Sequence, residues 1–407
     1  MNLPALRFKE FNEPWIDETI GKLIHEFRLG GDYSNSETET PFPLIKMGNL
    51  DRGTIKLNKI EFIEESEVAD PKDKIVFGDL FFNTRNTLDL VGKVAIWKNE
   101  LPCAYYNSNL MLMKFSNNFF MNFRLNSPVA VKKLRAIATG TTSVAAIYNK
   151  DLFQIKLETP SLTEQTKIAN FLTAVDEKIT QLTQKHDLLN QYKNGVMQQI
   201  FSQELRFKDD DGQDFPEWQE SCIGEVASFI KDGTHGTHQD TVDGEYLLLS
   251  AKNIKDGGIY YDESDRKISK LEFQSIYKNY KLHDGDVLLS VVGTIGRVAI
   301  YSSEFKNVAF QRSVAFFRFN NQNSQFIAQL FTAKQFQNDL ITNQVVSAQA
   351  GIYLGDLSKI KVKLPCLTEQ TKIANLLTTI DEKITATKTQ AQAVKQYKHG
   401  LLQQMFV

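Results

Sequence analysis

A short segment near residue 235 brings together histidine and aspartate, the residue types in this chain that could bind a metal ion. His235-Gly-Thr-His238 has a spacing at which two imidazoles can share one metal ion, and the nearest third ligands are Asp232 and Asp240. No third ligand candidate lies nearby other than these two aspartates, so a glycine-rich binding loop is the favoured interpretation. We therefore expect no metal here.

Other catalytic patterns are also incomplete. Asp70-Pro-Lys-Asp-Lys74 is the nearest approach to a nuclease pattern, and a solvated turn explains it more simply. Asn12-Glu-Pro-Trp15 is only a superficial match to an adenine-methyltransferase motif, and the sequence has no GxxxxGK[ST] phosphate-binding loop. The sequence predicts a chain that is not an enzyme and binds no cofactor itself.

The elements that must hold these loops occur twice. Leu162–Thr180 and Leu367–Thr385 are identical at sixteen of nineteen positions, 205 residues apart. Shorter pairs follow at nearly the same offset, among them LRFK at Leu6 and Leu205, GKVAIW and GRVAIY, and AIYNKDL and GIYLGDL. The chain is therefore one unit present twice, each copy a globular segment followed by a long helix.

Each predicted helix carries apolar residues at alternating spacings of four and three for about five heptads, along Ile168–Ile200 and Ile373–Met405. Lys193 and Lys398 interrupt the two stripes at the same heptad position. This is a coiled-coil pattern, and a helix of roughly 40 residues is on the order of 60 Å long. We expect the two helices to bury each other's stripes as an antiparallel pair; two unrelated core helices are the alternative. Ser161-Leu-Thr-Glu164 predicts a capping box at the first helix start.

The globular segments alternate short β-rich runs with turn signals and a few helical stretches, which predicts α/β units with mixed sheets. The expected boundaries are 1–160 for the first globular unit, 161–202 for the central helix, 203–365 for the second unit and 366–407 for the C-terminal helix. The three cysteines are scattered, and neither a signal peptide nor an 18-residue apolar run is present. A cytoplasmic protein without a membrane partner is the expectation.

Several of these motifs together carry a family resemblance. They are the two PxLTEQTKIAxxL segments, GDLFFNTRN with GKVAIW, and GDVLLSVVGTIGRVAIY. They resemble the specificity subunits of Type I restriction–modification systems, over essentially the whole chain. The resemblance implies two target recognition domains held apart by two antiparallel helices that set the gap between the halves of a split double-stranded DNA target. It also implies two modification subunits that methylate adenine with S-adenosylmethionine, and restriction subunits that use ATP and Mg²⁺ for motor and nuclease work.

On this resemblance, polar side chains on matched loops are the candidates for contacts with DNA bases. In the first copy they are Asn83, Thr84, Arg85, Asn86, Thr141 and Thr142. In the second copy they are Lys231, Thr234, His235, His238, Ser290, Thr294, Gln311, Arg312 and Gln349. Arg85 and Arg312 are the first choices, and an ordinary surface loop is the alternative for each position.

The charge departs from what the resemblance implies. Residues 1–160 carry 20 Lys and Arg against 20 Asp and Glu, and residues 203–365 carry 18 against 22. A DNA-binding surface is usually basic, so the chain alone is expected to bind DNA weakly. Two alternatives therefore stay open: a two-domain coiled-coil scaffold for protein or carbohydrate, and an enzyme of unrecognised chemistry.

Overall fold

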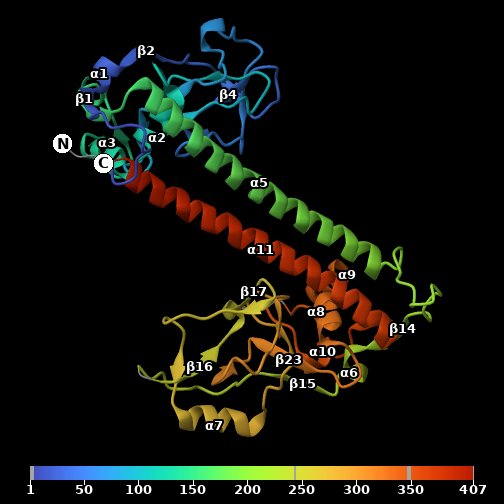
Figure 1. The fold of residues 1–407 in the computed structure, drawn as a ribbon. Coiled ribbons are helices and arrows are strands. Elements are labelled where there is room, and N and C mark those ends of the chain that lie inside the picture. The colour runs from blue at the N-terminus through green and yellow to red at the C-terminus, as the bar shows by residue number, and fades with distance from the viewer. Residues whose placement is uncertain (1–3, 243, 346–349, 407) are drawn as a thin grey trace. The chain divides into compact units, whose positions relative to one another are not determined.

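The computed structural model describes residues 4–242, 244–345 and 350–406. The chain divides into two compact units, Met1–Gln184 with Lys388–Val407 (unit 1) and Lys185–Thr387 (unit 2). Each unit joins one globular part to one segment of each long helix, α5 (Leu162–Phe201) and α11 (Leu367–Met405) (Figure 1). No helix among the described residues is long and apolar enough to cross a membrane.

Unit 1 is built on an antiparallel sheet of four strands in the order β2 (Ile24–Leu29), β10 (Leu110–Phe115), β6 (Leu80–Asn83) and β8 (Val94–Ile96). A second sheet has the order β3 (Asn35–Ser36), β5 (Glu61–Ile63), β4 (Pro43–Ile45) and β9 (Tyr105–Tyr106). Shorter pairings join β1 (Ile16–Thr19) to β13 (Lys156–Thr159), and β11 (Thr139–Gly140) through β12 (Ala145–Ala146) to β7 (Arg85–Asn86). The helices of the globular part are α1 (Ile20–Leu23), α2 (Asn118–Leu125), α3 (Pro128–Ala136) and α4 (Asn149–Leu152).

Unit 2 repeats this plan, with a central sheet in the order β15 (Phe229–Asp232), β23 (Val314–Arg318), β20 (Val287–Ser290) and β21 (Val298–Ile300). Its smaller sheets are β19 (Lys267–Ile268), β16 (Tyr246–Leu249) and β22 (Val308–Phe310), the pair β14 (Gln219–Cys222) and β24 (Lys361–Leu364), and the pair β17 (Ile254–Lys255) and β18 (Gly258–Ile259). Its helices are α6 (Ile223–Val226), α7 (Lys270–Asn279), α8 (Ser324–Thr332), α9 (Lys334–Thr342) and α10 (Leu354–Leu357). The mixed α/β fold and the internal duplication predicted from the sequence are confirmed.

In unit 1, one tryptophan marks where the two long helices meet the globular part. The Trp15 indole N–H donates to Glu164 at the start of α5 (3.3 Å), and its ring packs edge-on against Phe406, just after α11 ends (6.3 Å between centroids). The Leu6 N–H also donates to the Gln404 carbonyl (3.0 Å). The start of α5 thus lies beside the end of α11, so the two segments in this unit are antiparallel.

Unit 2 has the equivalent arrangement. The Trp218 indole N–H donates to Glu369 at the start of α11 (3.2 Å), and its ring packs against Phe201 at the end of α5 (6.3 Å). The Leu205 N–H donates to the Gln199 carbonyl (3.0 Å). Here the end of α5 lies beside the start of α11, again antiparallel.

The predicted heptad stripes are the packed faces of both helices. Every stripe position is buried or half-buried, whereas Leu188 and Tyr192 beside the first stripe are exposed. The lysines that interrupt the stripes are also used in the packing. Lys193 pairs with Asp381 (2.7 Å) in unit 2, and Lys398 pairs with Asp176 (2.6 Å) in unit 1. These two ion pairs occupy equivalent positions in the repeat, so both helix segments pack in the same register.

The predicted capping box is present only in part. The Ser161 hydroxyl accepts from the Glu164 N–H (3.4 Å), as expected of a cap. The Glu164 carboxylate, however, is buried and accepts from Trp15 and from two guanidinium nitrogens of Arg7 (both 2.8 Å). This hydrogen bond raises the pKa of Arg7. The helix start is therefore anchored to the N-terminal segment by a buried ion pair.

Candidate nucleic-acid interface

In unit 2, several predicted residues meet at the end of the central sheet. Thr234, just past β15, forms a bridge with Gln311, and its carbonyl accepts from the Arg312 N–H (3.0 Å). Arg312 and His235 line one cavity of about 460 Å³, together with Val292 after β20. The loops after β15, β20 and β22 thus form one continuous surface.

A glycine makes the close approach of these loops possible. A Cβ atom on Gly233 would lie 2.1 Å from the Phe310 carbonyl oxygen, so no other residue fits without moving the backbone. Gly30 has the same role in unit 1, where a Cβ would lie 2.2 Å from the Tyr106 carbonyl oxygen. The chain therefore builds the same backbone crossing in both units.

In unit 1 the structure joins the two predicted loops into one small sheet. Arg85 and Asn86 form β7, which pairs with β12, and the turn from β11 to β12 contains Thr141 and Thr142. The Leu88 N–H donates to the Thr142 carbonyl (3.1 Å), which ties the turn to the segment after β7. Residues 55 positions apart in the sequence thus share one surface.

The two preferred arginines are both exposed. Among the described residues, no hydrogen bond or ion pair holds the Arg85 or Arg312 side chain. Thr294 is also exposed, and His235 is 64% exposed while bonded to Asp232 (2.7 Å). These side chains are free to contact a ligand that approaches the loops.

Other candidates have local structural roles and are withdrawn as base contacts. Asn83 and Ser290 are completely buried, because they end the central strands β6 and β20. Asn83 accepts from the Arg85 N–H (3.2 Å), and Ser290 accepts from the Arg297 N–H (2.8 Å). Both side chains therefore hold the backbone of the segment that follows their strand.

The side chains of four further candidates already make hydrogen bonds within their own unit. The His238 ring bonds to Thr234 (2.7 Å) and Glu272 (2.5 Å), and only 9% of its side chain is exposed. The Lys231 ammonium donates to the Asn279 carbonyl (3.0 Å), and the Thr84 hydroxyl donates to the Asn109 carbonyl (3.1 Å). Asn86 accepts from the N–H of the next residue (2.8 Å), and Gln349 lies outside the described residues.

Sequence reasoning missed three positions in unit 1. Ser108 and Asn109 are half-buried on the turn between β9 and β10. This turn is equivalent to the turn of unit 2 that contains Arg312. The offset between the two repeats, applied to Arg312, would have identified them. Arg52 is half-buried, and its Nη1 atom has no hydrogen-bond partner. Burial, and after it the neighbouring charge of Arg135, lowers the pKa of Arg52. Since Arg135 bonds to Asp89 (3.1 Å) beyond β7, this positive cluster borders the β7 surface.

Both units match one family model, described as the Type I restriction modification DNA specificity domain, over residues 20–191 and 216–396. The chain belongs to this family. It is similar to the putative type I restriction enzyme MjaX specificity subunit of Methanocaldococcus jannaschii, with 22% identity over 98% of this chain and 95% of that protein. It is also similar to the type I restriction enzyme EcoBI specificity subunit of Escherichia coli, with 26% identity over 88% of this chain and 76% of that protein.

Solved structures have the same fold. The crystal structure of a Type-I restriction-modification system S subunit from M. genitalium superposes with a TM-score of 0.61 at 15% identity, covering 100% of this chain and 99% of that one. A chain from a study of complex assembly and conformational transition of the type I R-M system gives a TM-score of 0.54 at 17% identity, covering 98% of each chain. Family membership makes the chain a non-catalytic DNA-specificity subunit, with catalysis in partner subunits, and nothing supports the scaffold alternative.

Proposed function

We propose that each unit recognises one half of a split double-stranded DNA target, through the loops at the end of its central sheet. The observation that carries this proposal is a difference at one matched position. Arg85 pairs with Ala146 in unit 1, and Val292 pairs with Gly351 in unit 2, so Arg85 and Val292 occupy the same place in the scaffold.

The chemistry of these two side chains differs in a way that suits two half-sites. An arginine can donate two hydrogen bonds to guanine O6 and N7, whereas a small apolar side chain can contact the methyl group of thymine. A constant scaffold with different side chains at the matched loops is what a bipartite target with unlike halves requires.

We further propose that the paired helices set the gap between the half-sites and bind two modification subunits. Two equal binding faces are supported by the near-identity of the helical copies and by matched exposed residues. Leu162 and Leu367 are 54% and 53% exposed, and Tyr192 and Tyr397 are 57% and 55% exposed. Because both globular parts lack net positive charge, the partner subunits must supply much of the attraction for phosphate. Adenine methylation with S-adenosylmethionine, and restriction with ATP and Mg²⁺, belong to those partners.

Methylome sequencing of cells that carry the complex tests this function. Methylated adenines should appear in a two-part motif with a fixed gap, and Arg85→Ala should relax or weaken only one part. A methylome without any two-part motif, in a complex that contains an active methyltransferase, would contradict the proposal.

A further inference from the structure

The outer edge of β13 in unit 1 is covered by two basic side chains from the same unit. The Arg124 Nε atom donates to the Glu158 carbonyl (3.1 Å), and the Lys133 ammonium donates to the Lys156 carbonyl (2.8 Å). Arg124 is completely buried, and this burial lowers its pKa to about 10. Both carbonyls of the strand edge are thereby satisfied by cations.

Unit 2 lacks both of these cations at the equivalent edge. The helices align residue by residue, so that Leu330 of α8 stands where unit 1 has Arg124, and Asp339 of α9 stands where unit 1 has Lys133. The equivalent carbonyls belong to Lys361 and Lys363 of β24. No side chain of the described residues donates to either of them.

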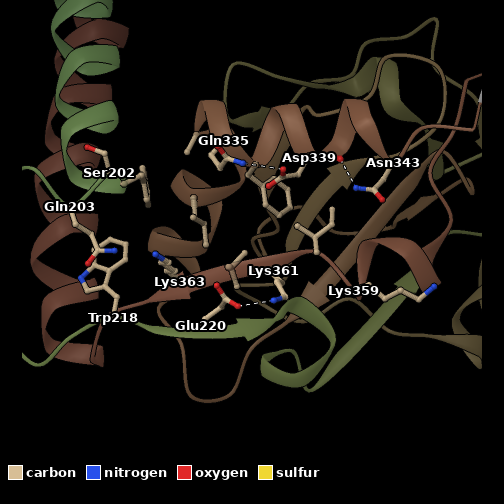
Figure 2. A pocket seen from close by; sticks show the side chains of 16 residues that line it. Ser202, Gln203, Trp218, Glu220, Gln335, Asp339, Asn343, Lys359, Lys361 and Lys363 are labelled. Carbon is tan, nitrogen blue, oxygen red and sulfur yellow. Dashed lines mark hydrogen bonds and ion pairs between the residues drawn. The ribbon is translucent and has the colours of Figure 1, made fainter.

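A cavity of about 610 Å³ opens along this uncovered edge. Figure 2 shows Lys361 and Lys363 of β24 on one side of it, and Asp339 and Asn343 at α9 on the other. Buried apolar side chains form the floor; they are Trp218, Leu330, Phe336, Ile360 and Val362. An unpaired strand edge over an apolar floor has the features of a site that accepts an extended peptide as an added strand.

We propose that the groove between β24 and α9 binds an extended segment of a partner protein, and that a basic residue of this segment pairs with Asp339. Unit 1 shows which chemistry satisfies such an edge, because there a buried guanidinium group and an exposed ammonium group donate to its carbonyls. In unit 2, Asp339 stands where unit 1 has Lys133; its carboxylate accepts a hydrogen bond from Gln335 (3.1 Å) but has no cationic partner among the described residues. This site is separate from the loops that we assign to DNA.

Two of the three lysines that line the groove do not oppose a basic segment. Lys361 is paired with Glu220 (2.9 Å), and Lys359 is paired with Asp356 (3.1 Å), so both charges are met within unit 2. Lys363, the third of them, has no ion-pair partner among the described residues and argues against a second copy of this chain as the occupant. Two β24 edges brought together would place lysine beside lysine, which is unfavourable between neighbouring strands.

Peptide binding to the full chain tests this proposal. The probe is the blocked pentapeptide acetyl-Ser-Val-Arg-Val-Ser-amide, compared with versions that carry Gln or Glu in place of Arg, with binding measured by ligand-observed NMR. We expect one Arg peptide per chain, bound at least about tenfold more tightly than the Gln and Glu peptides, since a charge-assisted pair is lost in both.

Matched variants locate the site. The double variant Leu330→Arg with Asp339→Lys copies the residues of unit 1. Its new arginine and lysine side chains should occupy the groove, so the Arg peptide should bind at least about tenfold more weakly. Glu263→Lys makes the same charge change as Asp339→Lys at an exposed position outside the groove, and should leave the affinity within about twofold. Asp339→Asn is the variant of choice if circular dichroism shows that the double variant is unfolded, and it should also discriminate less between Arg and Gln peptides.

Three results would overturn the proposal. They are equal affinity for the three peptides, tighter binding of the Glu peptide, and unchanged binding by folded Asp339 variants. Tighter binding of the Glu peptide would mean that the rim lysines select an acidic partner instead.

Discussion

The buried carboxylate of Glu369 gives the sharpest stability prediction. It is completely inaccessible to solvent and accepts from the Arg206 guanidinium (3.0 and 3.3 Å) and the Trp218 indole (3.2 Å). Glu369→Ala would leave the Trp218 indole without its acceptor and would break the ion pair of Arg206, which keeps only Glu217 and two backbone carbonyls as acceptors. Breaking a buried ion pair by removing one partner costs about 3 to 5 kcal/mol, so we expect a loss of this size. Glu369→Gln keeps one acceptor oxygen and should cost less, about 1 to 3 kcal/mol.

Urea unfolding followed by helical circular dichroism measures this loss. With a slope of about 3 kcal/mol per molar urea, the midpoint of Glu369→Ala should fall by about 1 to 1.7 M. Glu382→Ala removes an exposed acid from the same helix and should change stability by no more than about 0.5 kcal/mol. In a double-mutant cycle with Arg206→Met, the two losses should fall short of additivity by at least about 1 kcal/mol. A midpoint shift no larger than that of Glu382→Ala would refute the reasoning.

Three further predictions concern recognition, spacing and pH. Arg85→Ala and Arg312→Ala should each weaken methylation through its own half-site by about 5- to 150-fold, as measured by in vitro methylation of cognate DNA. Neither change should affect subunit assembly. Normal protection of a cognate plasmid by either variant would remove the substituted arginine from the interface. Insertion of one heptad in both helices, after Leu189 and after Val394, lengthens each by about 10 Å and should widen the gap in the methylated motif by about three base pairs. An unchanged gap would exclude the helices as the ruler. Burial raises the pKa of Asp79, so its charged form destabilises the fold; Asp79→Asn should therefore be more stable than the parent at pH 7, and the difference should disappear below the unfolded pKa of about 3.9.

The pH prediction has a matched control in unit 2. Asp286 occupies the position of Asp79 in the repeat but pairs with Arg318 (2.8 Å for each oxygen). Asp286→Asn should therefore lower stability at pH 7, because it weakens an ion pair. If urea midpoints moved in the same direction for both variants, burial would not explain the behaviour of Asp79.

The sequence was most informative where the determining pattern is local. The spacing of Ile168, Leu172 and their successors follows from helix geometry, so the packed stripes could be predicted position by position. The repeat likewise identified loops that the fold brings to the same end of each central sheet. The turn residues and polar composition around Arg85 and Arg312 predict surface positions, and both side chains are exposed, although Arg85 lies on the short strand β7 and not on a loop.

Predictions that depended on distant contacts were less accurate. Asn83 has a polar side chain, but its burial depends on strands that flank β6 from elsewhere in the chain. Glu164 fits a capping box in sequence, whereas its carboxylate is taken by Arg7, 157 residues away. The groove of unit 2 depends on Leu330 and Asp339 facing a strand edge. Neither residue suggests such a site until α8 and α9 are placed beside β24.

The contact between Leu6 and Gln404 in unit 1 matches the contact between Leu205 and Gln199 in unit 2 (3.0 Å in each). In unit 2 the two residues are only six apart along the backbone, so one covalent segment carries the chain through the junction. In unit 1 the same junction is held by non-covalent contacts, among them this hydrogen bond and the packing of Trp15 on Phe406. The segment before β1 thus lies beside the end of α11 within unit 1. A circular permutant that joins residues near 4 and 406 by a short linker and opens the backbone near 204 should retain every strand and helix, and the opening would simply move from one unit to the other.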